Sequence, residues 1–283
     1  MTTSQDILQN ARDALVWQLE AGIDECIGET PMDRFQQVPP PAAADAALSD
    51  LTSVDSAPPP AGRRRLPDRP LEAPVQAAKP IPGVQSAWDI ASQCDSIAEL
   101  EEAVRAFDGC PLKQTATNTV FADGNPDAKI MFIDEAPGAD EDRQGTPFVG
   151  VSGQLFDKMA ASIGLDRTNL YITNIVFWRP PGNRNPSTSE IAVCLPFVER
   201  HIELAGPDIL VPLGGPAAKT LLGVRQGITR LRGKWHPYQT SNMAAPIDAL
   251  PFFHPAYLLR SPAHKRESWL DLLAIKDRLA TGS

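Results

Sequence analysis

The chain has 283 residues, of which 42% are hydrophobic, and a formal net charge of −9. This length suits one large domain with an appendage. No apolar run approaches the roughly 18 residues that a membrane-spanning helix needs, and the N-terminus lacks the basic start and apolar core of a signal peptide. We therefore expect a cytoplasmic protein. The cysteines are widely spaced without a C-x-x-C pair, so no disulfide framework is expected: Cys26, Cys94, Cys110 and Cys194.

The negative charge is unevenly distributed along the chain. Acidic residues outnumber basic ones in residues 1–62, whereas residues 225–283 contain nine Lys/Arg and four Asp/Glu. A basic C-terminal part is consistent with a phosphate-binding face. A solvated surface with a chance excess of positive charge explains the same pattern, and charge alone favours that explanation.

The first 85 residues differ in composition from the rest of the chain. Residues 4–27 have apolar side chains at helical spacing, with Ser4 as the expected N-cap. Residues 38–82 are rich in Pro and Ala, which is typical of an extended, disordered linker. We therefore expect an N-terminal helical appendage (residues 1–37), a disordered linker (38–85) and a compact domain (86–283).

Beyond residue 86, short apolar runs alternate with helical patterns. This alternation predicts a three-layer α/β/α fold around a central, mostly parallel four-stranded sheet. The expected strands span residues 129–133, 170–176, 209–213 and 250–253. The expected helices span residues 96–106, 152–163, 188–205, 216–222 and 264–280.

Polar groups follow three of the expected strands: the turn 134–138, Asn174 and His254. The carboxyl ends of parallel strands meet at one edge of a sheet, where ligands bind. An Asn amide matches a ring that shows a carbonyl beside an N–H, and the nearby Phe148 offers a stacking face. An imidazole stabilises negative charge on a leaving-group oxygen. The sequence therefore predicts a pocket for a planar heterocycle.

Five motifs follow one another in this part of the chain: Glu135–Asp142, Pro147–Gly150, Thr173–Val176, Arg179–Arg184 and His254–Arg260. They resemble the motifs of the uracil-DNA glycosylase superfamily, most closely its family 4, the iron–sulfur type. The resemblance covers about residues 105–280 and leaves out residues 1–85. It implies a monofunctional DNA-repair enzyme, acting at the nucleoid, that flips uracil out of DNA and hydrolyses its N-glycosidic bond to leave an abasic site.

The resemblance also implies roles for individual residues. Asn174 would read the O4/N3 edge of uracil, and Phe148 would stack on the flipped base. His254 would bind O2 and stabilise the departing anion, so that with Asn174 and Glu135 it forms the expected catalytic set. Glu135 would position water or stabilise the cationic sugar. Glu141 would lie near uracil C5 and hinder the methyl group of thymine.

Further positions contact the base or the DNA in this resemblance. Ala136 stands beside the base where another branch has a water-activating Asp, so no carboxylate fills that role at this position. Two leucines occupy the place of a wedge that fills the gap in the duplex, and three basic residues would hold phosphates: Leu258, Leu259, Arg260, Lys265 and Arg266.

The chain departs from the family at its cluster cysteines. The family pattern C-x2-C … C-x15-C falls here on Phe107, Cys110, Trp178 and Cys194. A [4Fe–4S] cluster normally takes four thiolates, and two do not suffice. We therefore expect no metal and no cofactor, with the phenyl and indole rings filling the volume of a cluster. The alternative is an unusual ligand set, for which Cys94 or Cys26 would have to replace a missing thiolate.

A second departure is Asp134, which stands where the family usually has Gly. A carboxylate there narrows the pocket, repels a leaving anion or adds a second base. Two alternatives to a uracil glycosylase therefore stay open: a glycosylase for hypoxanthine or xanthine, and a non-catalytic module that binds damaged DNA. We expect a monomer whose partner is uracil-containing DNA, with no membrane contact and with an N-terminal segment available to a repair protein.

Overall fold

The computed structural model describes residues 83–281, so the helix expected over residues 4–27 and the linker over 38–82 lie outside the described residues. The strands of the described part are β1 (Ala122–Gly124), β2 (Ile130–Asp134), β3 (Tyr171–Asn174), β4 (Ile209–Pro212), β5 (His236–Tyr238) and β6 (Ile247–Ala249). Its α-helices are α2 (Val84–Ala91), α3 (Ile97–Ala106), α4 (Ala139–Gln144), α5 (Val151–Ala161), α6 (Thr188–Ala205), α7 (Gly214–Leu222), α8 (Ile228–Leu231), α9 (Pro255–Arg260) and α10 (Lys265–Thr281). None of these helices is long and apolar enough to cross a membrane.

The described strands form one mixed sheet in the order β1-β3-β2-β4-β6-β5. The four central strands run parallel, as predicted, but β1 and β5 add antiparallel edges, so the sheet has six strands rather than four. These edge strands are three residues long and only partly buried, and therefore lack the apolar run that marks a central strand. The strand predicted over residues 250–253 is also wrong, because β6 ends at Ala249 and only Phe252 forms a bridge, to Leu213.

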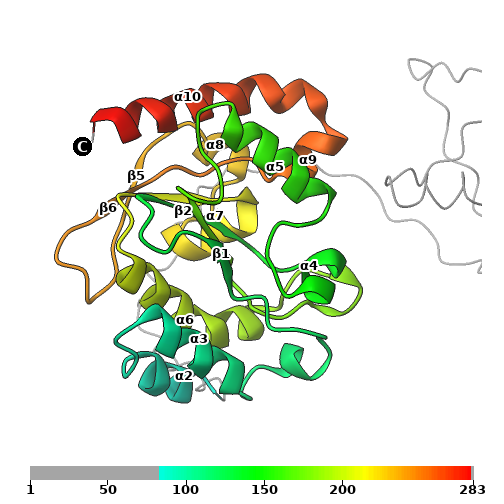
Figure 1. Cartoon of the computed structure of the whole chain (residues 1–283), viewed down its shortest axis with the longest axis vertical. Coiled ribbons are helices and arrows are strands. Elements are labelled where there is room, and N and C mark those ends of the chain that lie inside the picture. The colour runs from blue at the N-terminus through cyan, green and yellow to red at the C-terminus, as the bar shows by residue number, and fades with distance from the viewer. Residues whose placement is uncertain (1–82, 282–283) are drawn as a thin grey trace, which may run out of the picture. The chain divides into compact units, whose positions relative to one another are not determined.

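Helices cover both faces of the sheet (Figure 1). Successive side chains of a strand point to opposite faces, and β2 shows this alternation clearly. Met131 and Ile133 pack in the core beneath α2, α3 and α6. Ile130 and Phe132 pack in a second core beneath α5 and α10. The predicted three-layer α/β/α architecture is confirmed.

The starts of several helices follow from their capping residues. Ser187 and Glu190 form a capping box at the start of α6, which fixes its first turn. Helix α5 begins at Val151 with Gly150 as its N-cap, one residue before the start expected at residue 152. Helix α2 begins at Val84, two residues before the boundary expected at residue 86.

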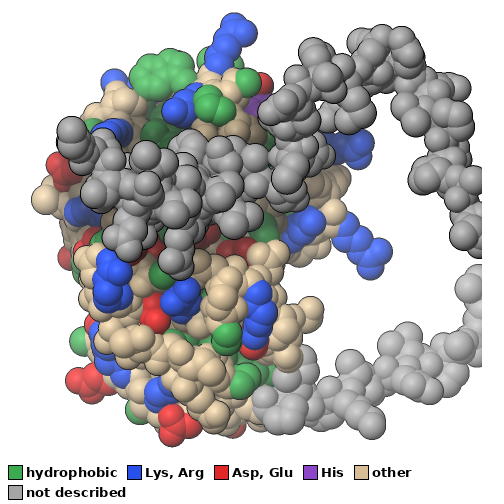
Figure 2. All heavy atoms as spheres, turned by 90° about the vertical axis from the view of Figure 1, so that its right-hand side faces the viewer, with side chains coloured by type: hydrophobic (Ala, Val, Ile, Leu, Met, Phe, Trp, Pro, Cys, Tyr) green, Lys and Arg blue, Asp and Glu red, His purple; other side chains and the backbone are tan. Residues whose placement is uncertain are grey.

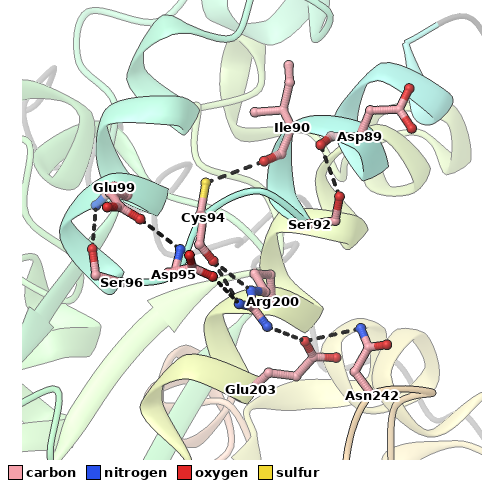
Figure 3. A network of polar contacts seen from close by, with 10 residues as sticks. All are labelled: Asp89, Ile90, Ser92, Cys94, Asp95, Ser96, Glu99, Arg200, Glu203 and Asn242. Atoms are coloured by element: carbon pink, nitrogen blue, oxygen red, sulfur yellow. Dashed lines mark hydrogen bonds and ion pairs between the residues drawn. The ribbon is translucent and has the colours of Figure 1, made fainter.

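Arg200 connects helix α6 with the turn between α2 and α3 (Figure 3). Arg200 of α6 donates two hydrogen bonds to the carbonyl of Cys94, at 2.9 and 2.8 Å, in the turn between α2 and α3. Its third contact, at 3.2 Å, is with Glu203, which also accepts from Asn242 at 3.3 Å. The Cys94 thiol points back to the carbonyl of Ile90 at 3.4 Å, so this cysteine belongs to the helix packing.

Candidate active site

A cavity of about 560 Å³ opens at the carboxyl ends of the central strands, where the sequence predicted a pocket. Its walls come from the turn after β2, the end of β3, the start of α7 and the start of α9. It brings together Glu135, Phe148, Asn174 and His254, as expected from the strand ends, and adds Asp134. Ala136 and Glu141 also line the cavity.

Strand pairing fixes the floor of the cavity. Asp134 ends β2 and lies opposite Asn174, the last residue of β3. The Asn174 side chain is 1% exposed, and its amide nitrogen has no hydrogen-bond partner among the described residues. Leaving a buried donor unpaired costs about 1–3 kcal/mol, so this amide is suited to bind an acceptor on a ligand.

His254 is oriented from both sides of its ring. It is the N-cap of α9, and its Nδ1 accepts a hydrogen bond from the backbone N–H of Ala256 at 3.0 Å. Its Nε2 lies 3.0 Å from Oδ2 of Asp134. Burial lowers the pKa of His254, but the Asp134 carboxylate and its hydrogen bond outweigh this effect, so the pKa lies above its usual value.

Glu135 follows Asp134 and also lines the cavity. Burial raises the pKa of Glu135, and the negative charge of Asp134 raises it further, while His254 acts in the opposite direction. A carboxyl group with a raised pKa holds its proton more readily near neutral pH, which suits a group that exchanges protons with water.

Phe148 is held in an uncommon backbone conformation. Its φ is 58°, in the left-handed region that non-glycine residues rarely occupy. Arg167 donates to its carbonyl at 3.0 Å, and a Cβ added at Gly153 would lie 2.0 Å from that same oxygen. The ring packs edge-on against Phe156 at 5.1 Å and lies 5.8 Å from the ring of His254. The loop therefore fixes the ring in the cavity wall.

Glu141 anchors the other side of the same loop. Its Oε1 accepts from the backbone N–H groups of Val149 and Gly150, at 3.1 and 2.9 Å. Its Oε2 lies so near Gly138 that a Cβ there would be 2.7 Å away, so a larger residue at this position would displace the Glu141 carboxylate. Glu141 thus holds the Phe148 loop in addition to lining the cavity.

The expected DNA-binding residues differ in exposure. Leu258 is fully buried, so of the two leucines only Leu259, at 42% exposed, presents its side chain to solvent. Arg260, Lys265 and Arg266 are exposed, and Arg260 lies at the cavity rim. The side that carries α4 and α9, on the right of Figure 1, faces the viewer in Figure 2, where Lys and Arg side chains stand out over the visible surface.

Residues 121–273 match the model of the uracil DNA glycosylase superfamily. The chain belongs to this superfamily. It is 39% identical over 173 residues to a type-4 uracil-DNA glycosylase of Sulfurisphaera tokodaii, which covers 59% of this chain and 78% of the relative. The type-4 enzyme of Thermotoga maritima is 38% identical over 173 residues, covering 59% and 84%. That of Archaeoglobus fulgidus is 36% identical over 177 residues, covering 61% and 88%. The predicted resemblance to family 4 is confirmed.

The positions of the cluster cysteines of this superfamily branch do not supply a four-thiolate set here. The sulfur atoms of Cys110 and Cys194 lie 3.9 Å apart and are buried. Phe107 packs edge-on against Phe197 at 5.0 Å, and Trp178 is 1% exposed. Among residues 83–281, no group of three or more His, Cys, Asp or Glu side chains is arranged to hold a metal ion. The donor set does not fit a [4Fe–4S] cluster.

Three residues that line or support the site were assigned no role from the sequence. Arg167 follows an exposed aspartate in a loop and carries no pattern that links it to Phe148. Gly153 lies inside a helix, and only its close approach to another backbone explains it. Arg184 lines the cavity and pairs with Glu190 at 2.7 Å. It belongs to the Arg179–Arg184 motif, which is the signal that could have identified it.

Proposed function

We propose that this member of the uracil-DNA glycosylase superfamily flips uracil out of DNA and hydrolyses its N-glycosidic bond, leaving an abasic site. One observation carries the proposal: a single cavity joins Phe148, Glu135 and His254 to the buried side-chain amide of Asn174, whose nitrogen has no partner within residues 83–281. A donor of this kind suits the O4 acceptor of uracil, whereas the N4 amino group of cytosine is itself a donor.

In the proposed reaction, unpairing the nucleotide costs a few kcal/mol, least where the base is mismatched. Phe148 stacks on the extruded base, and Leu259 fills the gap in the duplex. Arg260, Lys265 and Arg266 hold the phosphates on either side. The N-glycosidic bond breaks as the Nε2–H of His254 donates a hydrogen bond to uracil O2 and stabilises the departing anion. Glu135 positions the water that captures the cationic sugar.

We further propose that the protein works without an iron–sulfur cluster. Its support is the replacement of two thiolates by the buried side chains of Phe107 and Trp178. Interiors are packed to the density of organic crystals, and these two rings occupy the volume that a cluster would need. Iron and sulfide analysis of anaerobically purified protein tests this: we expect neither, and stoichiometric iron would overturn it.

An oligonucleotide panel tests the reaction. Full-length protein is incubated with single- and double-stranded oligonucleotides that carry uracil, hypoxanthine or xanthine, and both the free base and the alkali-labile site are measured. We expect uracil release with an alkali-labile site. Release of only a purine base would identify the other glycosylase, and binding without release would identify a damage-binding module.

Two variants test the assigned roles. Asn174→Ala removes the amide that reads the base, and His254→Ala removes the donor to the leaving group. Each is expected to slow uracil release at least roughly tenfold, since removal of one donor to a developing anion usually costs about 10²–10³ in rate. Arg105→Ala is the matched control, because its ion pair with Glu101 is exposed on α3. Unchanged rates in both variants would refute the assignment.

A further inference from the structure

Asn174 and His254 each present a hydrogen-bond donor to the cavity, and only one of these donors already has a partner in the described part of the chain. The amide nitrogen of Asn174 is buried without a partner among the described residues, so it is available to a ligand. His254 Nε2 already lies 3.0 Å from Asp134 Oδ2. Because Ala256 N–H donates to Nδ1 of the same ring, the proton of the neutral imidazole lies on Nε2 and points to Asp134.

The backbones of both partners are fixed. Asp134 ends β2, pairs with Asn174 on β3, and its carbonyl accepts from Ile175 N–H at 2.7 Å. His254 is held as the N-cap of α9. Asp134 is 8% exposed, so water competes weakly for its carboxylate. The contact therefore breaks only when the Asp134 side chain turns away from the ring or the imidazole gives up its hydrogen bond to Ala256.

We propose that Asp134 controls the access of the base to His254 by competing with the base carbonyl for the Nε2 proton. This inference rests on the proposed function, in which that N–H donates a hydrogen bond to uracil O2. A base that carries a carbonyl group then binds Asn174 without breaking a hydrogen bond of the protein. It reaches His254 only after the hydrogen bond between His254 and Asp134 is broken. An ionised carboxylate beside the departing anion also opposes bond cleavage. Asp134 thus makes this pocket slower on uracil than the same pocket without it.

Single-turnover excision of uracil from a single-stranded oligonucleotide tests the competition in the full chain. We expect Asp134→Ala to excise uracil at least tenfold faster than the wild type. Asp134→Asn keeps an acceptor oxygen without charge, so its rate is expected to lie between the two. Asp127→Asn is the control, because Asp127 is exposed and precedes the start of β2, at the end of the strand opposite to Asp134. Folded Asp134 variants that are no faster than the wild type would overturn the proposal.

A second readout does not depend on turnover. The chain has four histidines, so ¹⁵N-histidine NMR spectra can be assigned by substitution. We expect the Nε2–H of His254 to exchange slowly with water in the wild type and at least tenfold faster in Asp134→Ala. An exchange rate that does not change would show that Asp134 does not hold the proton, and would overturn the proposal.

The two proposals fail in different ways. If neither the wild type nor the Asp134 variants excise uracil, the proposed function is refuted. The competition is then tested by binding, with the Kd for a single-stranded uracil oligonucleotide compared with that for its thymine counterpart. Uracil-specific binding at least tenfold tighter in Asp134→Ala supports competition for the carbonyl. Equal affinities in wild type and variant refute it.

Discussion

Arg167 offers the sharpest test of how the stacking ring is positioned. The Phe148 backbone lies in the left-handed region, which costs a non-glycine residue roughly 1–2 kcal/mol. The guanidinium of Arg167 donates to the Phe148 carbonyl at 3.0 Å, and a hydrogen bond from a charged donor contributes about 1.5–3 kcal/mol. The bond is therefore large enough to offset the strain, and its loss is expected to release the loop.

The expected effect of Arg167→Ala follows from that range. Since about 1.4 kcal/mol corresponds to a factor of ten in rate, we expect kcat/KM for uracil excision to fall roughly tenfold to hundredfold. The ion pairs of Arg167 with Asp123 and Asp157 contribute less, because solvent reaches both carboxylates, whose side chains are 36% and 49% exposed. Arg167→Lys keeps the charge without the planar fork, so its loss is expected to be intermediate.

A double-mutant cycle with Phe148→Ala separates positioning from general stability. If Arg167 acts through the ring, Arg167→Ala is expected to cost less than about threefold once the ring is absent. Thermal unfolding of each variant shows that the fold is retained, and Arg105→Ala is the control for loss of one surface ion pair. Equal losses in both backgrounds, or an Arg167→Ala enzyme within threefold of the wild type, would refute the reasoning.

Three further predictions follow from contacts in and near the cavity. Glu141→Gln keeps an acceptor for the Phe148 loop, so its rate of uracil excision is expected to stay within about threefold of the wild type, whereas the rate of Glu141→Ala is expected to fall at least roughly tenfold. Assays on thymine oligonucleotides show whether Glu141→Ala also admits the methyl group. Hydrogen bonds from the Arg184 side chain and from Ser187 lower the pKa of Glu190 from 4.5 to about 2. The ionised Glu190 therefore stabilises the fold above pH 4.5, and this contribution is lost as the pH falls towards 2. Thermal unfolding from pH 6 to 2 is expected to show a gap between wild type and Arg184→Gln that narrows over this range; a constant gap would contradict it. Trp178→Ala is expected to lower the free energy of unfolding by about 3–5 kcal/mol in denaturant titrations, without changing the iron content; a loss under 1 kcal/mol would show that the ring does not fill the core.

Sequence patterns predicted the elements that have strong periodicity or caps. The buried runs of β2 and β4 and the long helix α6, with its Ser187 cap, lie close to where they were expected. The edge strands β1 and β5 and the short helices α4, α8 and α9 were missed, because three to six residues carry too little pattern to identify an element. Tertiary contacts, not local preference, decide their conformation.

The site was predictable to the extent that strand ends converge. Asn174 and His254 were found because parallel strands place their carboxyl ends together. The bond between Asp134 and His254 was not, since it depends on side-chain geometry that no spacing encodes. Arg167 was missed for a related reason: it acts on the carbonyl of a residue 19 positions away.

The contact between Asp134 and His254 joins residues 120 positions apart in the chain. Closing so long a segment costs conformational entropy, and parallel pairing of β2, β4 and β6 has to be in place before the two groups meet. No local part of the chain can assemble the cavity early. Excision activity recovered during refolding therefore reports completion of the sheet, and it is expected to return later than helical circular dichroism.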